Sequence, residues 1–148
     1  AILWLTLFRD KIDEIMEQVK CPVAVFVNRQ YREGTTVSFV FGGMIDLFLF
    51  SYLDKMLQNG HSVRLFLFDT DDEEFRGRID DLQVRYPEQT MIVWFEGVVT
   101  EEKDGLLIMS HLSYTKLSED EAVMRELSSL LVIRRNKNTG DKNEGLEN

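Results

Sequence analysis

Short apolar runs of strand length alternate with amphipathic segments of helix length along most of this chain. Residues 23–27 form a continuous apolar run rich in β-branched side chains. Such a run is typical of a strand that helices cover on both faces of a parallel sheet. Apolar residues at helical spacing precede it between Arg9 and Lys20. Cys21-Pro22 should end that helix, because the residue before a proline disfavours the helical conformation.

The same alternation continues toward the C-terminus and indicates βαβ units. Further strands are predicted at Thr36–Phe41, Ser62–Phe68, Met91–Val99, Leu106–Leu112 and Leu130–Ile133, with helices at Ile45–Gln58, Asp69–Val84 and Ser118–Leu127. Ser118 and Glu121 have the spacing of a capping box, which predicts Ser118 as the N-cap of the last helix. The predicted fold is an α/β three-layer sandwich, Rossmann-like, with a mostly parallel sheet and helices on both faces.

A single domain is expected to span residues 1–135, and residues 136–148 form a polar tail with a composition typical of disorder. The apolar run Ile2–Phe8 has two interpretations. It is either a strand of the domain's own sheet or a strand paired or exchanged with a second copy, which would make the protein a homodimer.

Composition narrows the range of partners. The formal net charge is −9 and no Lys/Arg cluster dominates, which argues against binding to nucleic acid or to an anionic membrane. The long apolar stretch at 37–57 is interrupted by glycines and charged residues, so we expect no membrane-spanning helix. The chain has one cysteine, Cys21, which fits a reducing compartment and which we expect to be buried. A leader sequence is not expected at Ile2–Phe8, because no basic residues precede it.

The pair Gly42-Gly43 lies between a predicted strand and a predicted helix, where doubly wound folds bind phosphate. Glycines there let backbone amides approach an anion. A tight turn without any ligand needs the same residues, and neither a complete dinucleotide fingerprint nor a phosphate loop with its lysine is present. Both interpretations stay open.

The acidic run Asp69–Glu74 also follows a predicted strand. Its carboxylates could hold a divalent cation, and they would then have to converge with another acid such as Asp46 to support phosphoryl transfer. Alternatively, Asp69 or Thr70 caps a helix whose dipole the following acids complement. Neither histidine has a metal-ligand or triad partner in the sequence, so no catalytic constellation is predicted and no cofactor is identified.

Several segments resemble the cytosolic carboxy-terminal region of monovalent cation:proton antiporters. The helix leading into Cys21–Arg29 resembles the family's helix and following strand, and Val40–Asp46 is similar to its "F-F-G-G-x-x-D" block. Val63–Phe68 resembles the next strand, Asp72–Phe75 the acidic helix start and Ser129–Arg135 the last strand.

That resemblance implies a non-catalytic regulatory or dimerisation domain at the cytoplasmic face of the membrane, joined to the transport domain of the same polypeptide. It also implies a fold like that of universal stress proteins, some of which bind ATP. In that comparison Asn28, Gly42, Gly43 and Asp46 are the candidate ligand contacts. The late glycine-rich phosphate motif of the nucleotide-binding members is missing. A stand-alone stress-type protein and the cation-dependent enzyme are the alternatives.

Overall fold

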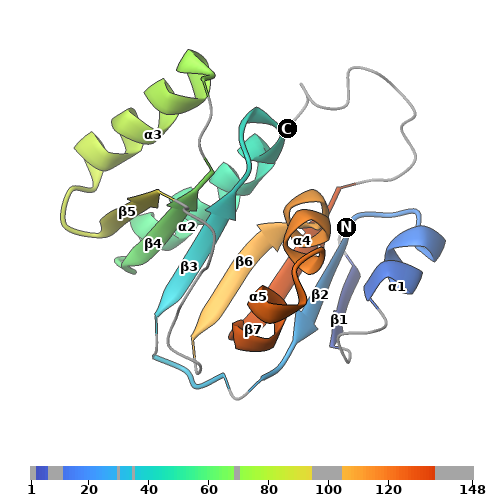
Figure 1. Cartoon of the computed structure of the whole chain (residues 1–148). Coiled ribbons are helices and arrows are strands. Elements are labelled where there is room, and N and C mark those ends of the chain that lie inside the picture. The colour runs from blue at the N-terminus through green and yellow to red at the C-terminus, as the bar shows by residue number, and fades with distance from the viewer. Residues whose placement is uncertain are drawn as a thin grey trace.

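A computed structural model describes residues 3–6, 12–29, 31–34, 36–68, 71–94 and 105–135 (Figure 1). Its centre is a seven-stranded sheet with the order β1-β2-β7-β6-β3-β4-β5. The strands are β1 (Leu3–Thr6), β2 (Val23–Val27), β3 (Val37–Phe41), β4 (Val63–Leu67), β5 (Thr90–Trp94), β6 (Leu106–Ser110) and β7 (Ser129–Arg134).

The sheet is mostly parallel, as predicted. Strands β3 to β7 all pair in parallel, and counted in chain order from β3 they lie in the order 3-2-1-4-5 of a doubly wound sheet. Strand β2 pairs antiparallel with β7 and parallel with β1. Burial on both faces did not reveal this direction, because a strand in the middle of a covered sheet is buried whichever way it runs.

Helices cover both faces of the sheet, which confirms the predicted three-layer α/β fold (Figure 1). One face carries the 3₁₀ helix η2 (Met44–Leu49), α2 (Phe50–Gln58) and α3 (Glu73–Arg85), and the other carries α1 (Ile12–Gln18), α4 (His111–Ser118) and α5 (Glu121–Glu126). Because successive strand residues point to opposite faces, Phe39 and Phe41 of β3 pack under the first group while Val40 packs under the second.

The apolar N-terminal segment resolves into β1, which pairs with β2 of the same chain from Leu3 opposite Val23 to Thr6 opposite Phe26. The strand therefore belongs to the domain's own sheet. The predicted polar tail at 136–148 lies outside the described residues, as do residues 95–99 of the predicted Met91–Val99 strand.

Two arginines close the carboxyl ends of helices. Arg134, at the end of β7, donates hydrogen bonds to the carbonyls of Met16, Val19 and Cys21, just where α1 ends. Arg29 donates to the carbonyls of Met124 and Arg125 at the end of α5. Each guanidinium satisfies carbonyls that lack partners within the helix and lies at the negative end of the helix dipole.

Three details differ from the sequence-based predictions. The apolar run at 106–112 is split, because β6 ends at Ser110 and α4 begins at His111. Asp120 rather than Ser118 caps α5, with its carboxylate accepting from the amides of Ala122 and Val123. Cys21 is exposed rather than buried. Within the described ranges, no helix combines the length and apolarity needed to cross a bilayer.

Candidate functional site

The sheet has a topological switch point between β3 and β6. From β3 the chain adds β4 and β5 on one side, and it then returns to add β6 and β7 on the other. The connections after β3 and β6 therefore leave toward opposite faces. In open α/β sheets, ligands bind in the crevice that this divergence creates outside the carboxyl ends of the strands. The residues following β3 and β6 are therefore the first candidates for a functional site.

The turn after β3 brings together three of the residues singled out from the sequence: Gly42, Gly43 and Asp46. Gly43 has a φ of 134°, which side-chain-bearing residues rarely adopt, so the turn requires glycine at this position. The amide of Asp46 donates to the carbonyl of Gly43 at 3.0 Å. The turn therefore places Asp46 in the first turn of η2, directly beyond the end of β3.

The carboxylate of Asp46 is the central group of this site. The residue is 0% exposed. Its Oδ2 accepts a 2.6 Å hydrogen bond from the Gly42 amide and a 3.0 Å hydrogen bond from the Ser113 hydroxyl. Its Oδ1 is equally buried and has no partner within the described part of the chain. Burying a carboxylate oxygen without a hydrogen-bond donor lowers the stability of the fold, so the groups around Asp46 must explain why the carboxylate is buried there.

The other wall of the crevice is the start of α4. Ser110, the last residue of β6, is the N-cap, and its hydroxyl accepts from the Ser113 amide at 3.1 Å. Ser113 thus has a fixed position in the first turn of α4, with its own hydroxyl free to donate to Asp46. Both serines are buried.

Backbone dipoles supply the positive potential at this carboxylate. Asp46 lies in the first turn of η2, which continues directly into α2, and it is hydrogen-bonded to the first turn of α4. The amino ends of helices carry partial positive charge and stabilise an anion. No lysine, arginine or histidine of the described ranges forms an ion pair with Asp46. The site is therefore a cradle for negative charge made of amides, hydroxyls and helix ends.

Gly42 permits the close approach of the three groups. A Cβ at this position would lie 3.2 Å from Asp46 Oδ2 and 3.2 Å from Ser113 Oγ. Those distances are shorter than ordinary van der Waals contacts, so a Cβ would require the carboxylate and the hydroxyl to shift by a few tenths of an ångström. Packing therefore favours glycine at position 42, whereas the backbone angle favours it at position 43.

Asn28, the fourth residue singled out from the sequence, lies at the other end of the strands. It is next to the amino end of β7, whereas Asp46 follows the carboxyl end of β3. Asn28 follows β2, and β2 runs antiparallel to β7, so the carboxyl end of β2 meets the amino end of β7. Asn28 Oδ1 accepts from the Tyr31 amide at 3.1 Å and from the Ser129 hydroxyl at 3.5 Å. The structure therefore gives Asn28 a role in the turn after β2 and separates it from the Gly42–Asp46 turn.

In the acidic run, the helix cap is Asp72. Its Oδ1 accepts from the amides of Glu74 and Phe75 at the start of α3. Asp69 and Thr70, the residues predicted to cap, lie outside the described residues. Within the described ranges, no three His, Cys, Asp or Glu side chains are grouped so that they could hold a metal ion.

Among the described residues, neither histidine is a hydrogen-bond partner of Asp46, although His111 directly follows Ser110. His61 is exposed. His111, at the start of α4, makes a 3.1 Å contact through Nε2 with Asp13 Oδ1 of α1. This contact ties two helices of the same layer together, and its aspartate is largely exposed.

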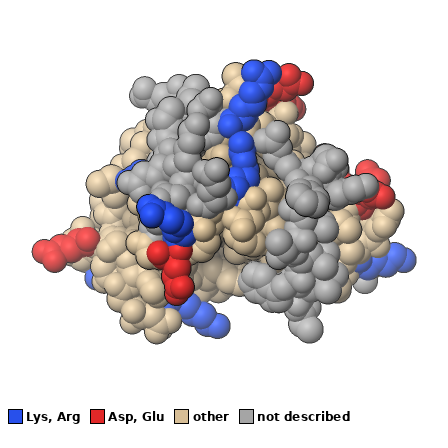
Figure 2. All heavy atoms as spheres, turned by 90° about the horizontal axis from the view of Figure 1, so that it is seen from below, with Lys and Arg blue, Asp and Glu red and all other residues tan. Residues whose placement is uncertain are grey.

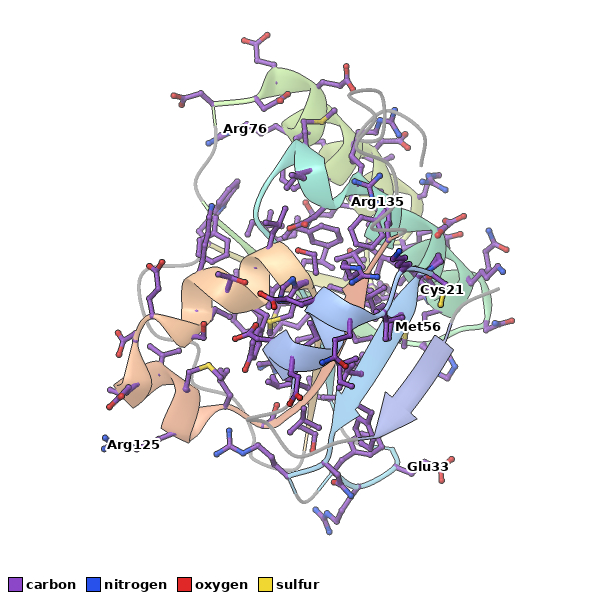
Figure 3. All side chains as sticks on the ribbon, turned by 90° about the vertical axis from the view of Figure 1, so that its right-hand side faces the viewer. Cys21, Glu33, Met56, Arg76, Arg125 and Arg135 are labelled. Atoms are coloured by element: carbon purple, nitrogen blue, oxygen red, sulfur yellow. The ribbon has the colours of Figure 1, made fainter. Side chains whose placement is uncertain are left out.

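A groove lies at the amino ends of β3, β4 and β5, on the lower side of the sheet. It has a volume of about 980 Å³, and its walls include Tyr31, Met56, His61, Arg64 and Met91. Figure 2 views the molecule from this lower side and shows acidic and basic side chains spread over the face rather than gathered by sign. In Figure 3, Glu33 of the groove lies at the lower end of the molecule and Arg135 lies nearer the upper end.

Sequence reasoning missed Ser110 and Ser113. The available signal was a serine followed by Tyr114 and Leu117, which lie on one face if a helix begins directly after Ser110. Leu112 extends the preceding apolar run and conceals that start. Comparison of the whole chain with protein-family models, with curated proteins and with solved structures finds no match.

Proposed function

We propose that this chain is a non-catalytic regulatory and dimerisation domain of a monovalent cation:proton antiporter, acting at the cytoplasmic face of the membrane. The assignment to the antiporters rests on the sequence resemblance of the segments around Cys21–Arg29, Val40–Asp46 and Ser129–Arg135. The non-catalytic part of the proposal rests on the geometry of the switch point.

One observation supports the non-catalytic part of the proposal. The crevice in which doubly wound sheets bind their ligands is filled by the Asp46 carboxylate, held between the Gly42 amide and the Ser113 hydroxyl. A substrate phosphate would need these same donors. In addition, Asp72, one of the acids in the Asp69–Glu74 run that the enzyme alternative could use as metal ligands, accepts two amide hydrogen bonds as a helix cap.

Regulation by such a domain requires two states of the transporter. A domain changes transport only when it interacts more strongly with one conformation of the transport domain than with the other. The described surface offers groups for such contacts. Met91 and Trp94 of β5 are 58% and 44% exposed, and Arg76 of α3 lies 5.0 Å above the Trp94 ring.

Strand β5 also offers a surface for the homodimer. Within the described residues it is an edge strand that pairs only with β4, and an edge strand with apolar side chains invites pairing with another chain. Sedimentation equilibrium of the native chain and of Met91→Lys tests this part. We expect a dimer whose dissociation constant rises in the variant, while Val84→Lys, at an exposed position of α3, leaves it unchanged. A monomeric native chain would contradict the dimerisation role.

The reading frame of the gene tests the antiporter assignment. A continuous frame in which a series of apolar helices precedes this chain supports the proposal, and a short frame that encodes this chain alone overturns it. In vesicles containing the full-length antiporter, Met91→Lys should then alter the cation dependence of proton exchange. Identical dependence with and without the substitution would contradict a regulatory role.

Thermal melts separate the proposal from the enzyme alternative. A cation-dependent phosphoryl-transfer enzyme should gain stability from millimolar Mg²⁺, because a ligand that binds only the folded state raises its melting temperature. Under the proposed function, Mg²⁺ leaves the melting temperature of the native chain unchanged. A saturable rise would favour the enzyme.

A further inference from the structure

We propose that the switch-point crevice is a binding site for a small oxyanion, and that the chain occupies this site with its own Asp46 carboxylate. The inference concerns the chemistry of the site and does not depend on the antiporter assignment. It makes Asp46 the residue that decides whether a free anion can bind.

The groups that surround the carboxylate select an anion. The Gly42 amide can only donate a hydrogen bond, and the Ser113 hydroxyl donates to the carboxylate because an ionised carboxylate oxygen can only accept. The amino end of α4 adds positive potential. An oxyanion is stabilised by each of these groups, whereas a cation would be repelled by the amide and by the helix end.

The unpartnered oxygen indicates that Asp46 is an imperfect occupant. Asp46 Oδ1 is buried without a donor although Oδ2 has two. The carboxylate is tethered to the first turn of η2 through one methylene, so the backbone of that turn fixes where the group lies. A free carboxylate or phosphate of similar size is not tethered and could place its oxygens independently.

Gly42 supports the same inference from the shape of the site. A Cβ there would lie 3.2 Å from both Asp46 Oδ2 and Ser113 Oγ, so the backbone itself forms the floor against which the anion rests. Close approach of a glycine backbone to an oxyanion at a helix start is the feature that phosphate-binding turns share. Here the anion is the Asp46 carboxylate, which belongs to the same turn as Gly42.

Chemical rescue of Asp46→Ala tests the proposal. The substitution removes one carboxylate group, which is the size of formate, and leaves the Gly42 amide and the Ser113 hydroxyl in place. We would follow the melting temperature of the full chain in sodium formate and in sodium phosphate, each against sodium chloride of equal ionic strength. Three matched samples serve as controls: the native chain, Asp46→Asn, which still fills the space, and Asp54→Ala, which removes a surface carboxylate bonded to Gln58 on α2.

The proposal predicts that formate or phosphate raises the melting temperature of Asp46→Ala in a saturable manner beyond the effect of chloride. Each of the three controls should gain less than Asp46→Ala does, and without saturation, because phosphate stabilises any folded protein to some extent by exclusion from its surface. The proposal is overturned if Asp46→Ala responds to formate and phosphate only as it responds to chloride, or if the native chain gains as much as the variant.

Asp46→Ala could fail to fold in chloride, and refolding then provides the readout. Dilution from urea into formate or phosphate should restore the folded fraction, whereas dilution into chloride should not. No recovery in either anion overturns the proposal. None of these results depends on the reading frame or on transport, so a failure of this inference is distinguishable from a failure of the proposed function.

Discussion

The hydroxyl of Ser113 donates a 3.0 Å hydrogen bond to the carboxylate of Asp46, a residue 67 positions earlier in the chain. Asp46 belongs to the helical layer on one face of the sheet and Ser113 to the layer on the other. Side chains from opposite layers can meet only beyond the end of the sheet. The bond therefore fastens the two halves of the doubly wound fold together at the switch point.

Ser113→Ala should destabilise the fold. The substitution removes one of the two donors to a buried carboxylate, and a hydrogen bond to a charged group contributes about 1.5–3 kcal/mol. Urea denaturation gives the free energy of unfolding. Thr115→Ala, which removes an exposed hydroxyl bonded to a carbonyl of the same helix, is the matched control and should change much less. Equal stability of Ser113→Ala and the native chain would show that the bond contributes nothing.

Gly42→Ala and Gly77→Ala should change stability in opposite directions. A methyl group at Gly42 forces the Asp46 carboxylate and the Ser113 hydroxyl apart, and such overpacking costs about 1–3 kcal/mol. A methyl group at Gly77, in the middle of α3, meets nothing within 4 Å and should stabilise the helix by about 0.5–1 kcal/mol. Thermal and urea unfolding measure both. A stabilised Gly42→Ala would contradict the close-packed cradle.

Asp72→Ala should lower stability by about 0.5–2 kcal/mol, the usual effect of losing an N-cap. Asp71→Ala, at the exposed neighbouring position, should stay within about 0.5 kcal/mol of the native chain. Unfolding of both variants with and without Mg²⁺ is the measurement. If Asp72→Ala abolished a Mg²⁺-dependent stabilisation of the native chain, Asp72 would be a metal ligand rather than a cap.

Arg134→Ala should cost about 1.5–3 kcal/mol, because the carbonyls at the end of α1 lose a charged donor. Arg125→Ala is a suitable control, since the Arg125 side chain forms an exposed pair with Glu121 one helical turn away, and such pairs contribute little. Amide hydrogen exchange would locate the loss. Faster exchange confined to α1 in Arg134→Ala is expected, and unchanged α1 protection would argue against the cap.

Local patterns predicted most of the elements. The sequence predicts β3, β4 and β7 to within one residue at each end, because strands buried on both faces are mostly apolar. The Gly42-Gly43 turn was also placed correctly between a strand and a helix. These features depend on neighbours in sequence and can therefore be seen in it.

Long-range relationships were not predictable in the same way. The direction of β2 depends on pairing with β7, more than a hundred residues away, and this pairing moves Asn28 to the end of the strands opposite Gly42. Ser113 reaches Asp46 only because the sheet topology places the carboxyl end of β6 beside that of β3. The start of α4 was concealed because Leu112 continues the apolar run of β6. Asp120 and Ser118 are both acceptable caps, and local sequence alone does not choose between them.

The central claim is that the Asp46 carboxylate fills the crevice where a ligand phosphate would otherwise bind. Calorimetric titration of the native chain with ATP and with inorganic phosphate tests it most directly. We predict no saturable heat from either, because the Gly42 amide and the Ser113 hydroxyl are already bound to Asp46. Saturable binding of ATP or phosphate to the native chain, lost in Gly42→Ala, would contradict the claim.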